Sequence, residues 1–194
     1  MKEKKLCLDL CAGLGGFSRA FKDREDWEVV TVDYNSKFQP DIIAKVEDLL
    51  EDEKFMALRP DVILASPPCE RWSIANSQWP QEGIYEAAKA LGACLEIIAR
   101  MKPKGWILEN PKGRMRWFLR KPRATVSLLQ FGYKTVKPTD FWTNIDIGLL
   151  SYVNMRKNPN GLKFNRDIGR ASHQRAKMPE GLSQMILERV EVES

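Results

Sequence analysis

The reactive side chain with the most constrained setting is Cys69, in the run Ser66-Pro67-Pro68-Cys69-Glu70-Arg71-Trp72-Ser73. Two consecutive prolines fix the backbone as it leaves a predicted strand, so the next side chain is held in one direction. An unperturbed thiol has a pKa of about 8.5, and the nearby Arg71 favours the thiolate. We therefore predict a nucleophile at Cys69. The commoner role of cysteine, a small buried hydrophobic residue, is expected for Cys7, Cys11 and Cys94.

A second reactive pattern is Leu108-Glu109-Asn110-Pro111, which follows a short apolar run. A carboxyl group at a strand end in a closed pocket has a raised pKa, and such a group suits general-acid chemistry. A local cap or salt bridge is the structural alternative for Glu109. Asn110 is predicted to position either a substrate or the loop that carries Cys69.

A glycine-rich turn follows the first predicted strand, in Asp9-Leu10-Cys11-Ala12-Gly13-Leu14-Gly15-Gly16-Phe17. Glycines let the backbone pass close under a ligand, and the next helix offers free N–H donors. The glycine spacing does not fit the GxGxxG pattern of dinucleotide enzymes. Asp33, at the end of the second predicted strand, can accept both hydroxyls of a ribose, although it could also be a surface acid or a cap. Together the two features favour a cofactor that contains a nucleoside.

These residues need elements that bring them together. Short apolar or β-branched runs predict strands over 5–10, 28–33, 61–65 and 106–109, with a strand pair over about 133–142. Helices are expected to begin at 17–21 and to cover 83–101, about 121–130 and 180–191. Alternating strands and helices predict an open, mostly parallel α/β sheet flanked by helices. Ligands of such sheets bind beyond the carboxyl ends of the strands, where all the reactive residues lie.

Composition places further limits on function. The chain has 194 residues with 43% hydrophobic content, so a single domain over 1–194 is expected. No apolar run is long enough for a membrane span, and the start of the chain does not resemble a signal peptide. Four cysteines without CxxC spacing and one histidine argue against a metal site or a disulfide framework. We expect a soluble, cytoplasmic protein that contains no metal.

Charge is distributed unevenly along the chain. Residues 1–99 hold 12 Lys/Arg and 18 Asp/Glu, whereas residues 100–140 hold 11 Lys/Arg and 2 Asp/Glu, a net charge of +9 for the latter. Such a basic segment suits a polyanion, although a solvated basic helix is an equally common explanation. Aromatic residues, which stack on unpaired bases, favour nucleic acid here: Trp106, Trp117, Phe118 and Trp142.

Taken together and in this order, the motifs resemble the cytosine-C5 DNA methyltransferase family. Asp9–Phe17 is similar to its cofactor motif, Asp-Leu-Phe-x-Gly-x-Gly-Gly-Phe, and Ser66–Ser73 is similar to its Pro-Pro-Cys loop. Glu109-Asn110 matches its Glu-Asn-Val motif, with Pro111 in third place. Lys177–Leu182 loosely resembles the segment that completes the cofactor pocket. The resemblance covers about residues 5–142 and the C-terminus, and it suggests a short, phage- or archaeon-like member.

The resemblance implies a Rossmann-like class I fold, S-adenosyl-L-methionine as cofactor, and DNA, duplex or single-stranded, as substrate. It implies catalysis by Cys69, which adds to C6 of cytosine, with Glu109 protonating N3 and Asn110 positioning. Phe17 and Trp72 are more readily explained by core packing than by the pocket. The implied cofactor contacts are Asp9, Cys11, Ala12, Gly13, Gly15, Gly16, Phe17, Asp33, Tyr34, Asp48, Ser66 and Pro67. The implied substrate contacts are Pro68, Arg71, Ser73, Lys137 and Thr139.

The chain departs from the family pattern at several points. Glu70 stands where Gln is usual, and Lys45 stands where an acid for the cofactor adenine is expected, which leaves Asp48 as a stand-in. The Gln-x-Arg-x-Arg motif is not evident, and Lys137–Trp142 occupies its region. A large target-recognition domain is missing, since only a loop-rich insert over 144–172 is available for it. A homodimer or a separate recognition partner is therefore left open.

Three alternatives remain at this point. The same chemistry could act on RNA or on a free cytosine nucleotide, although the basic segment argues against a mononucleotide. A non-catalytic cofactor- or nucleic-acid-binding subunit would not need a thiol at position 69. A nicotinamide-dependent oxidoreductase conflicts with the glycine spacing.

Overall fold

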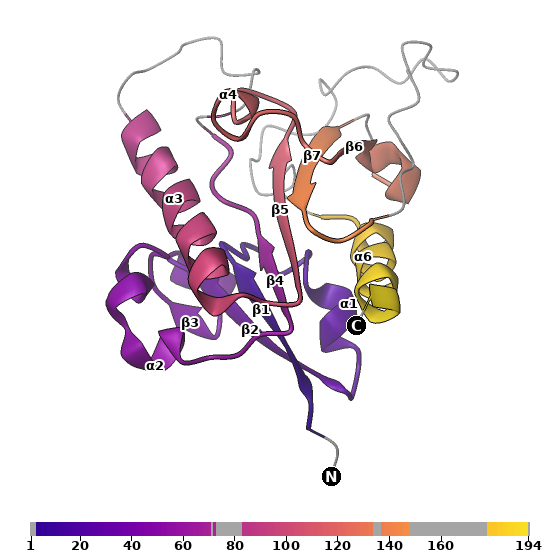
Figure 1. The fold of residues 1–194 in the computed structure, drawn as a ribbon. Helices are drawn as coiled ribbons and strands as arrows, with labels where there is room; N and C mark the ends of the chain where they lie inside the picture. The colour runs from indigo at the N-terminus through magenta and orange to yellow at the C-terminus, as the bar shows by residue number, and fades with distance from the viewer. Residues whose placement is uncertain (1–2, 71, 73–82, 134–136, 148–177, 194) are drawn as a thin grey trace, which may run out of the picture.

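A computed structural model describes residues 3–70, 72, 83–133, 137–147 and 178–193 of the chain. Seven strands form one sheet in the order β3-β2-β1-β4-β5-β7-β6 (Figure 1). The strands are β1 (Lys5–Leu10), β2 (Trp27–Asp33), β3 (Ile42–Ile43), β4 (Val62–Ala65), β5 (Gly105–Pro111), β6 (Ala124–Ser127) and β7 (Pro138–Thr143).

Strands β1 to β5 are mutually parallel, whereas β7 runs antiparallel to both β5 and β6. All four residues of β4 are buried, as are the last four of β1. Central parallel strands are covered on both faces, which is why their sequences are continuously apolar. The predicted mostly parallel α/β sheet is confirmed.

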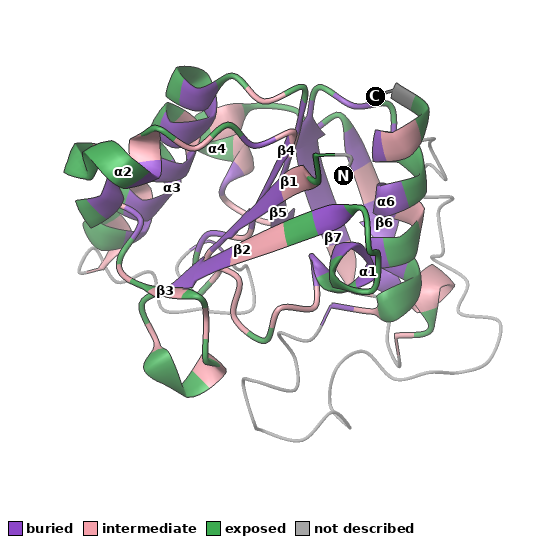
Figure 2. Ribbon diagram, turned by 90° about the horizontal axis from the view of Figure 1, so that it is seen from below, coloured by how far each residue is buried: buried purple, intermediate pink, exposed green. Residues whose placement is uncertain are grey.

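Helices cover both faces of this sheet (Figures 1 and 2). On one side, α3 (Ile84–Met101) turns a buried stripe toward the sheet at helical spacing, which includes Ala87, Leu91, Cys94 and Ile98. On the other side lie α1 (Arg19–Lys22) and α6 (Glu180–Glu193), which contact each other. Figure 2 shows the buried strands between these two layers.

Short helical segments complete the fold. They are the α-helices α2 (Glu53–Met56) and α4 (Arg116–Leu119), and the 3₁₀ turns at Ser36–Phe38, Asp48–Glu51 and Leu128–Phe131. Within the described part of the chain, no helix is both long and apolar enough to cross a lipid bilayer. Of the insert predicted over 144–172, only 144–147 lies within the described residues, and Ile145 and Ile147 are buried there.

Two elements predicted from the sequence are wrong. The helix expected over about 121–130 is instead β6 followed by the 3₁₀ turn Leu128–Phe131. Pro122 precedes the strand, and pairing with β7 outweighs the helical pattern of this short run. The strand pair expected within 133–142 is β6 with β7, so its first strand lies earlier in the chain than predicted.

Candidate active site

The loop that carries Cys69 leaves the carboxyl end of β4. Ala65 pairs with Leu108 of β5, so the residues that follow lie opposite Glu109 and Asn110. Pro67 is buried, Pro68 is exposed, and Cys69 is partly buried. The backbone N–H of Trp72 donates a 3.0 Å hydrogen bond to the carbonyl of Cys69, which closes the loop as a turn.

Asn110 joins this loop to β5. Its side-chain amide donates a buried 2.9 Å hydrogen bond to the carbonyl of Pro67. Because a buried carbonyl without a donor is costly, this bond ties the position of the Pro-Pro-Cys loop to the end of β5. The Asn110 Oδ1 atom is buried and has no hydrogen-bond partner among the described residues, so it can still accept a bond from a ligand.

Glu109 is the buried carboxyl group of the site, with 6% of its surface exposed. Burial raises the pKa of Glu109 above its ordinary value, and the positive charge of Lys137 opposes that rise. The hydroxyl of Ser66 lies close enough to the carboxyl group to lower its pKa, although neither this hydroxyl nor Glu109 Oε1, both buried, has a hydrogen-bond partner of good geometry within the described part of the chain. A protonated carboxyl group aimed into such a site can act as a hydrogen-bond donor or general acid.

Charges of both signs act on Cys69. Burial raises the pKa of its thiol, the carboxyl of Glu109 raises it further, and Lys137 lowers it. Arg71, which was expected to favour the thiolate, lies outside the described residues. The cation that the structure places near the thiol is therefore Lys137, on the strand β7 side of the site.

Trp72 is a second residue that fixes the position of the Cys69 loop, and its side chain is fully buried. The carbonyl of Trp72 accepts a 2.8 Å hydrogen bond from the backbone N–H of Arg114, and its ring packs edge-on against Phe118 with 5.0 Å between centroids. A Cβ atom at Gly113 would lie 2.3 Å from the Trp72 carbonyl oxygen. Only glycine permits this close approach, and the expected core packing of Trp72 is confirmed.

The glycine-rich turn lies at the carboxyl ends of β1 and β2. Gly13 and Gly15 have φ values of 52° and 68°, a conformation that glycine adopts without strain. The Gly13 N–H donates a 2.8 Å hydrogen bond to one carboxylate oxygen of Asp33, and the Asn35 N–H donates a 2.9 Å bond to the other. Since each carboxylate oxygen accepts two bonds, Asp33 shapes the turn and retains capacity for hydroxyl groups.

Asp9 lies beneath this turn and is fully buried. Its Oδ2 atom accepts a 2.6 Å hydrogen bond from the hydroxyl of Ser18, and its Oδ1 atom has no partner within the described residues. Burial raises the pKa of Asp9 to about 7, with the Ser18 bond opposing the rise.

The C-terminal segment closes against the same turn. A Cβ atom at Gly16 would lie 3.1 Å from the Cβ of Met178, so the two backbones pass close together. The Ser183 hydroxyl donates a 2.7 Å hydrogen bond to the carbonyl of Phe17 and accepts one of 3.0 Å from the Ala20 N–H. The segment from Met178 therefore lies beside the glycine-rich turn, as the resemblance implied, while Lys177 lies outside the described residues.

Two of the implied cofactor contacts lie on the surface. Tyr34 is 64% exposed, and Asp48 is exposed on the turn Asp48–Glu51. Phe17 is buried and packs on Phe141, with 6.5 Å between ring centroids, so its expected core role is confirmed. Thr139 is buried and donates to the Lys137 carbonyl at 3.2 Å. Ser73, like Arg71, lies outside the described residues.

The expectation for the remaining cysteines holds for two of them. Cys7 and Cys94 are fully buried in the two hydrophobic clusters. Cys11 is partly exposed, and a hydrogen bond to the Cys94 thiol, with burial, raises its pKa. Among the residues that the structure describes, no group of three or more His, Cys, Asp or Glu side chains could hold a metal ion.

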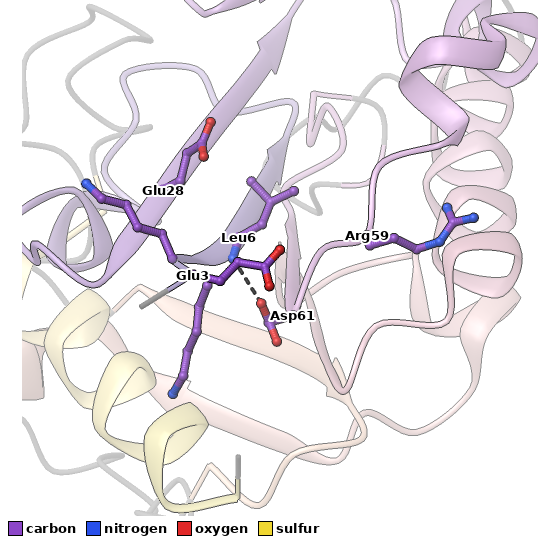
Figure 3. Close-up of a pocket in the computed structure, with 7 residues that line it drawn as sticks. Glu3, Leu6, Glu28, Arg59 and Asp61 are labelled. Carbon is purple, nitrogen blue, oxygen red and sulfur yellow. Dashed lines mark hydrogen bonds between the residues drawn. The ribbon is translucent and has the colours of Figure 1, made fainter. Parts of the chain in front are cut away.

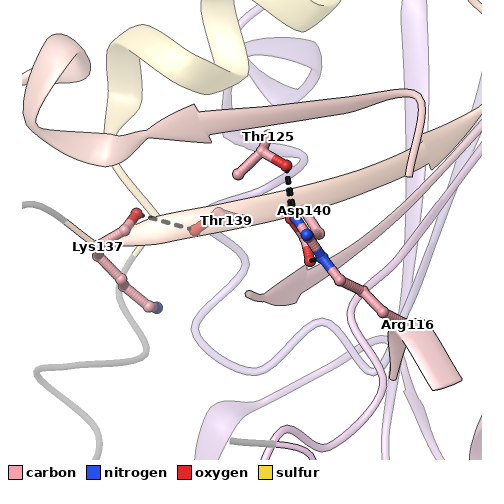
Figure 4. A network of polar contacts seen from close by, with 5 residues as sticks. All are labelled: Arg116, Thr125, Lys137, Thr139 and Asp140. Atoms are coloured by element: carbon pink, nitrogen blue, oxygen red, sulfur yellow. Dashed lines mark hydrogen bonds and ion pairs between the residues drawn. The ribbon is translucent and has the colours of Figure 1, made fainter. Parts of the chain in front are cut away.

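Sequence reasoning missed a buried polar network beside the site (Figure 4). Arg116 of α4 donates to Asp140 of β7, with 2.6 Å from Nε to Oδ2, and Thr125 of β6 donates to Asp140 at 2.7 Å. Asp140 is fully buried and lies in register with Asn110. Arg116 belongs to the basic segment over 100–140, and only the pairing of β6 with β7 shows its structural partner.

A hollow at the opposite edge of the sheet is separate from this site (Figure 3). It lies at the amino ends of β1, β2 and β4, and its lining residues include Glu3, Glu28, Arg59 and Asp61. Asp61 accepts a 3.0 Å hydrogen bond from the Leu6 N–H there. Because the reactive residues all lie at the carboxyl ends of the strands, the hollow does not include them.

A likeness in fold links the chain to a solved structure from an E. coli prophage, described as a DNA modification methyltransferase. The superposition gives a TM-score of 0.53 at 14% sequence identity and covers 72% of this chain and 46% of that one. At this identity the likeness shows the fold alone, a methyltransferase-like α/β sheet.

Sequence comparisons identify the family. The model of the C-5 cytosine-specific DNA methylases matches residues 6–134. The "Probable DNA (cytosine-5)-methyltransferase" of Frog virus 3 is 32% identical over 179 residues, which cover 78% of this chain and 79% of the viral protein. The type II methyltransferase M.AplI of Arthrospira platensis is 27% identical over 79% of this chain and 42% of its own length. The chain therefore belongs to the family of C-5 cytosine-specific DNA methylases.

Proposed function

We propose that this protein transfers a methyl group from S-adenosyl-L-methionine to C5 of cytosine in DNA, through a covalent bond between Cys69 and C6 of the base. The observation that carries the proposal is the pairing of a thiol and a buried carboxyl group on adjacent strand ends. The carboxyl group of Glu109 lies close enough to raise the pKa of the Cys69 thiol, and Asn110 ties the Cys69 loop to the end of β5.

The residues present fit the cofactor. The turn that carries Gly13 and Gly15 leaves backbone uncovered by side chains, and Asp33 beside it can accept ribose hydroxyls. A buried Asp9 oxygen and a buried Ser66 hydroxyl, both without a partner among the described residues, are available for polar contacts. The cofactor would lie over this turn, beside the segment that begins at Met178. When bound there, S-adenosyl-L-methionine supplies an electrophilic methyl group.

The chain's own residues would prepare the base. C5 of cytosine is a weak nucleophile, and addition of the Cys69 thiolate to C6 makes it enamine-like. Glu109, whose raised pKa keeps its carboxyl protonated to a higher pH, would place that proton at N3 as the new C–S bond forms. After methylation, loss of the C5 proton expels the Cys69 thiolate and restores the aromatic ring.

Lys137 would balance the charges of this pair. Its positive charge lowers the pKa of both Cys69 and Glu109, which favours the thiolate of one and limits the rise of the other. The reaction needs a thiolate together with a protonated carboxyl group: Lys137 favours the first, and burial, the largest cause, keeps the pKa of Glu109 raised in spite of that charge. The hydroxyl of Thr139 on β7 donates a hydrogen bond to the backbone carbonyl of Lys137, which would help to hold Lys137 in place.

DNA is the proposed substrate because the family acts on DNA and because the basic segment over 100–140 suits a polyanion. A cytosine in a duplex would have to be flipped out of the stack, or offered in a single strand, before Cys69 could reach C6. The chain spans less than half the length of M.AplI.

The direct test is to incubate the protein with tritiated-methyl S-adenosyl-L-methionine and, in parallel, with duplex DNA, single-stranded DNA, RNA and dCMP. Nucleosides are then released and identified by mass spectrometry. We expect 5-methylcytosine in DNA, and none with Cys69→Ser, which should still bind the cofactor. Transfer only to RNA or dCMP would contradict the proposed substrate, and binding of NAD instead of the cofactor would contradict the reaction.

A further inference from the structure

A basic surface adjoins the nucleophile loop at the carboxyl edge of the sheet. Residues Lys112–Arg123, here called the α4 surface, follow β5 and include α4 (Figure 1). They hold six cationic side chains and no carboxylate, and no Asp or Glu occurs in the sequence from 110 to 139. A polyanion is the natural partner of such a surface.

Two of the segment's aromatic residues are presented to solvent. Trp117 is 71% exposed and Phe118 is 53% exposed, whereas Trp142 is buried at 7%. Of the four aromatic residues that suggested nucleic-acid binding, Trp142 therefore belongs to the core. Most of the Trp117 ring therefore faces solvent, and exposed aromatic rings among cations are the pattern of surfaces that stack unpaired bases.

The neighbours of Trp117 fix its backbone in place. Arg116 is anchored to the buried Asp140 and to Thr125, with 2.8 Å from its Nη2 to the Thr125 hydroxyl (Figure 4). On the other side, the ring of Phe118 packs on Trp72. An exposed ring on a rigid backbone loses little entropy when it stacks on a base.

The same contacts connect the surface to the reaction. Phe118 touches Trp72, and the Trp72 N–H bonds to the carbonyl of Cys69. A strand that delivers its cytosine to Cys69 would therefore pass directly over α4. Arg120, Lys121 and Arg123 are exposed, and within the described residues none of them pairs with a carboxylate.

We infer that the α4 surface docks the DNA strand that carries the target cytosine, with Trp117 stacked on an unpaired neighbouring base and Arg120 and Arg123 on the phosphates. This inference rests on the proposed function and deepens it. It gives the chain a means of holding a single-stranded stretch beside Cys69.

The stacking role is tested by fluorescence anisotropy with a fluorescein-labelled single-stranded oligonucleotide that contains one cytosine. Trp117→Ala should weaken binding about 5- to 150-fold, the range of one base–aromatic stack. Trp117→Phe should restore most of that loss, since it keeps an aromatic face. Tyr85→Ala is the matched control, because Tyr85 is 66% exposed on α3, outside the α4 surface.

The phosphate contacts are tested by the salt dependence of the same binding. Arg120→Gln/Arg123→Gln should reduce the slope of log Kd against log salt by roughly 1.4, or about 0.7 for each lost contact. Trp117→Ala should leave that slope unchanged. Lys4→Gln/Lys54→Gln removes the same charge from two exposed lysines outside the α4 surface and should leave the slope near that of the wild type.

These outcomes separate the inference from the proposed function. If the wild type methylates DNA while Trp117→Ala and the double arginine variant bind the strand as it does, the α4 surface is not the docking site. Absence of methyl transfer by the wild type, with binding still lost in both variants, would instead contradict the function alone. Tighter binding of a matched RNA than of DNA would overturn the choice of partner. Thermal unfolding of each variant checks that the fold is intact.

Discussion

The side-chain amide of Asn110 donates a 2.9 Å hydrogen bond to the backbone carbonyl of Pro67, and both groups are buried. The bond follows from the register of the sheet. Ala65 of β4 pairs with Leu108 of β5. Two residues further along each segment, Pro67 beyond the end of β4 therefore lies beside Asn110 near the end of β5. One side chain thereby sets the distance between the loop that carries Cys69 and the strand end that carries Glu109.

Replacing Asn110 by alanine should lower both stability and turnover. The Pro67 carbonyl would be left buried without a donor, at a cost of about 1–3 kcal/mol in the free energy of unfolding. Steady-state kinetics should show a fall in kcat with little change in cofactor affinity. Asn144→Ala is the control, since the Asn144 amide also bonds a backbone carbonyl, that of Lys104, away from the site. Equal losses of kcat in the two variants would contradict a positioning role for Asn110.

The reactivity of Cys69 should depend on the charges around it. Since burial and Glu109 raise the pKa of the thiol, alkylation of Cys69 by iodoacetamide should speed up as pH rises above neutral. Lys137→Gln should move this profile to higher pH because it removes the charge that lowers the pKa, and Glu109→Gln should move it to lower pH. Peptide mass spectrometry measures the rate at Cys69 alone. A profile that neither variant moves would show that the three groups do not interact.

The buried Asp9 should make stability depend on pH. Its folded pKa of about 7 lies above the unfolded value of about 3.9, so the folded state binds the proton more tightly. The contribution is fully present below about pH 4 and is lost as pH rises toward 7. Urea unfolding should show that the wild type loses about 3 kcal/mol more than Asp9→Asn between pH 5 and pH 8. Asparagine can keep the bond from Ser18, and parallel loss in both proteins would contradict the assignment.

Gly113 should tolerate no side chain. A Cβ atom would lie 2.3 Å from the Trp72 carbonyl oxygen, a backbone atom that cannot move without shifting the Cys69 loop. We expect Gly113→Ala to reduce both the melting temperature and methyl transfer. Gly92→Ala is the matched control, because a Cβ atom there meets nothing within 4 Å, and alanine in a helix is stabilising by up to about 1 kcal/mol. Wild-type activity in Gly113→Ala would show that the loop does not depend on this contact.

The sequence was informative wherever one local pattern determines one element. Short apolar or β-branched runs predicted β1, β2, β4 and β5, because most residues of these parallel strands are buried. The run that forms β6 gave no such signal, since four residues with one partner strand depend on β7 for their conformation. The local pattern of residues 121–130 therefore predicts a helix, although these residues form β6 and the 3₁₀ turn that follows it.

In the candidate site, too, local sequence patterns identified individual residues but not the contacts between distant ones. Cys69, Glu109 and Asp33 could be placed from the sequence because each follows a predicted strand, and the carboxyl ends of parallel strands meet. The dependence of Cys69 on Lys137, and of Trp72 on Gly113, involves residues far apart in the chain. Nothing in the local sequence marks such contacts, so only the arrangement of β5 and β7 shows them.

The central claim is the covalent bond between Cys69 and C6 of cytosine, and it can be trapped. An oligonucleotide with 5-fluorocytosine at the target position cannot lose its C5 substituent as a proton, so the adduct should persist in the presence of S-adenosyl-L-methionine. Intact-mass measurement should show one oligonucleotide bound to each protein, and digestion should map it to Cys69. Methyl transfer to ordinary DNA without any adduct, or an adduct at Cys11, would contradict the mechanism.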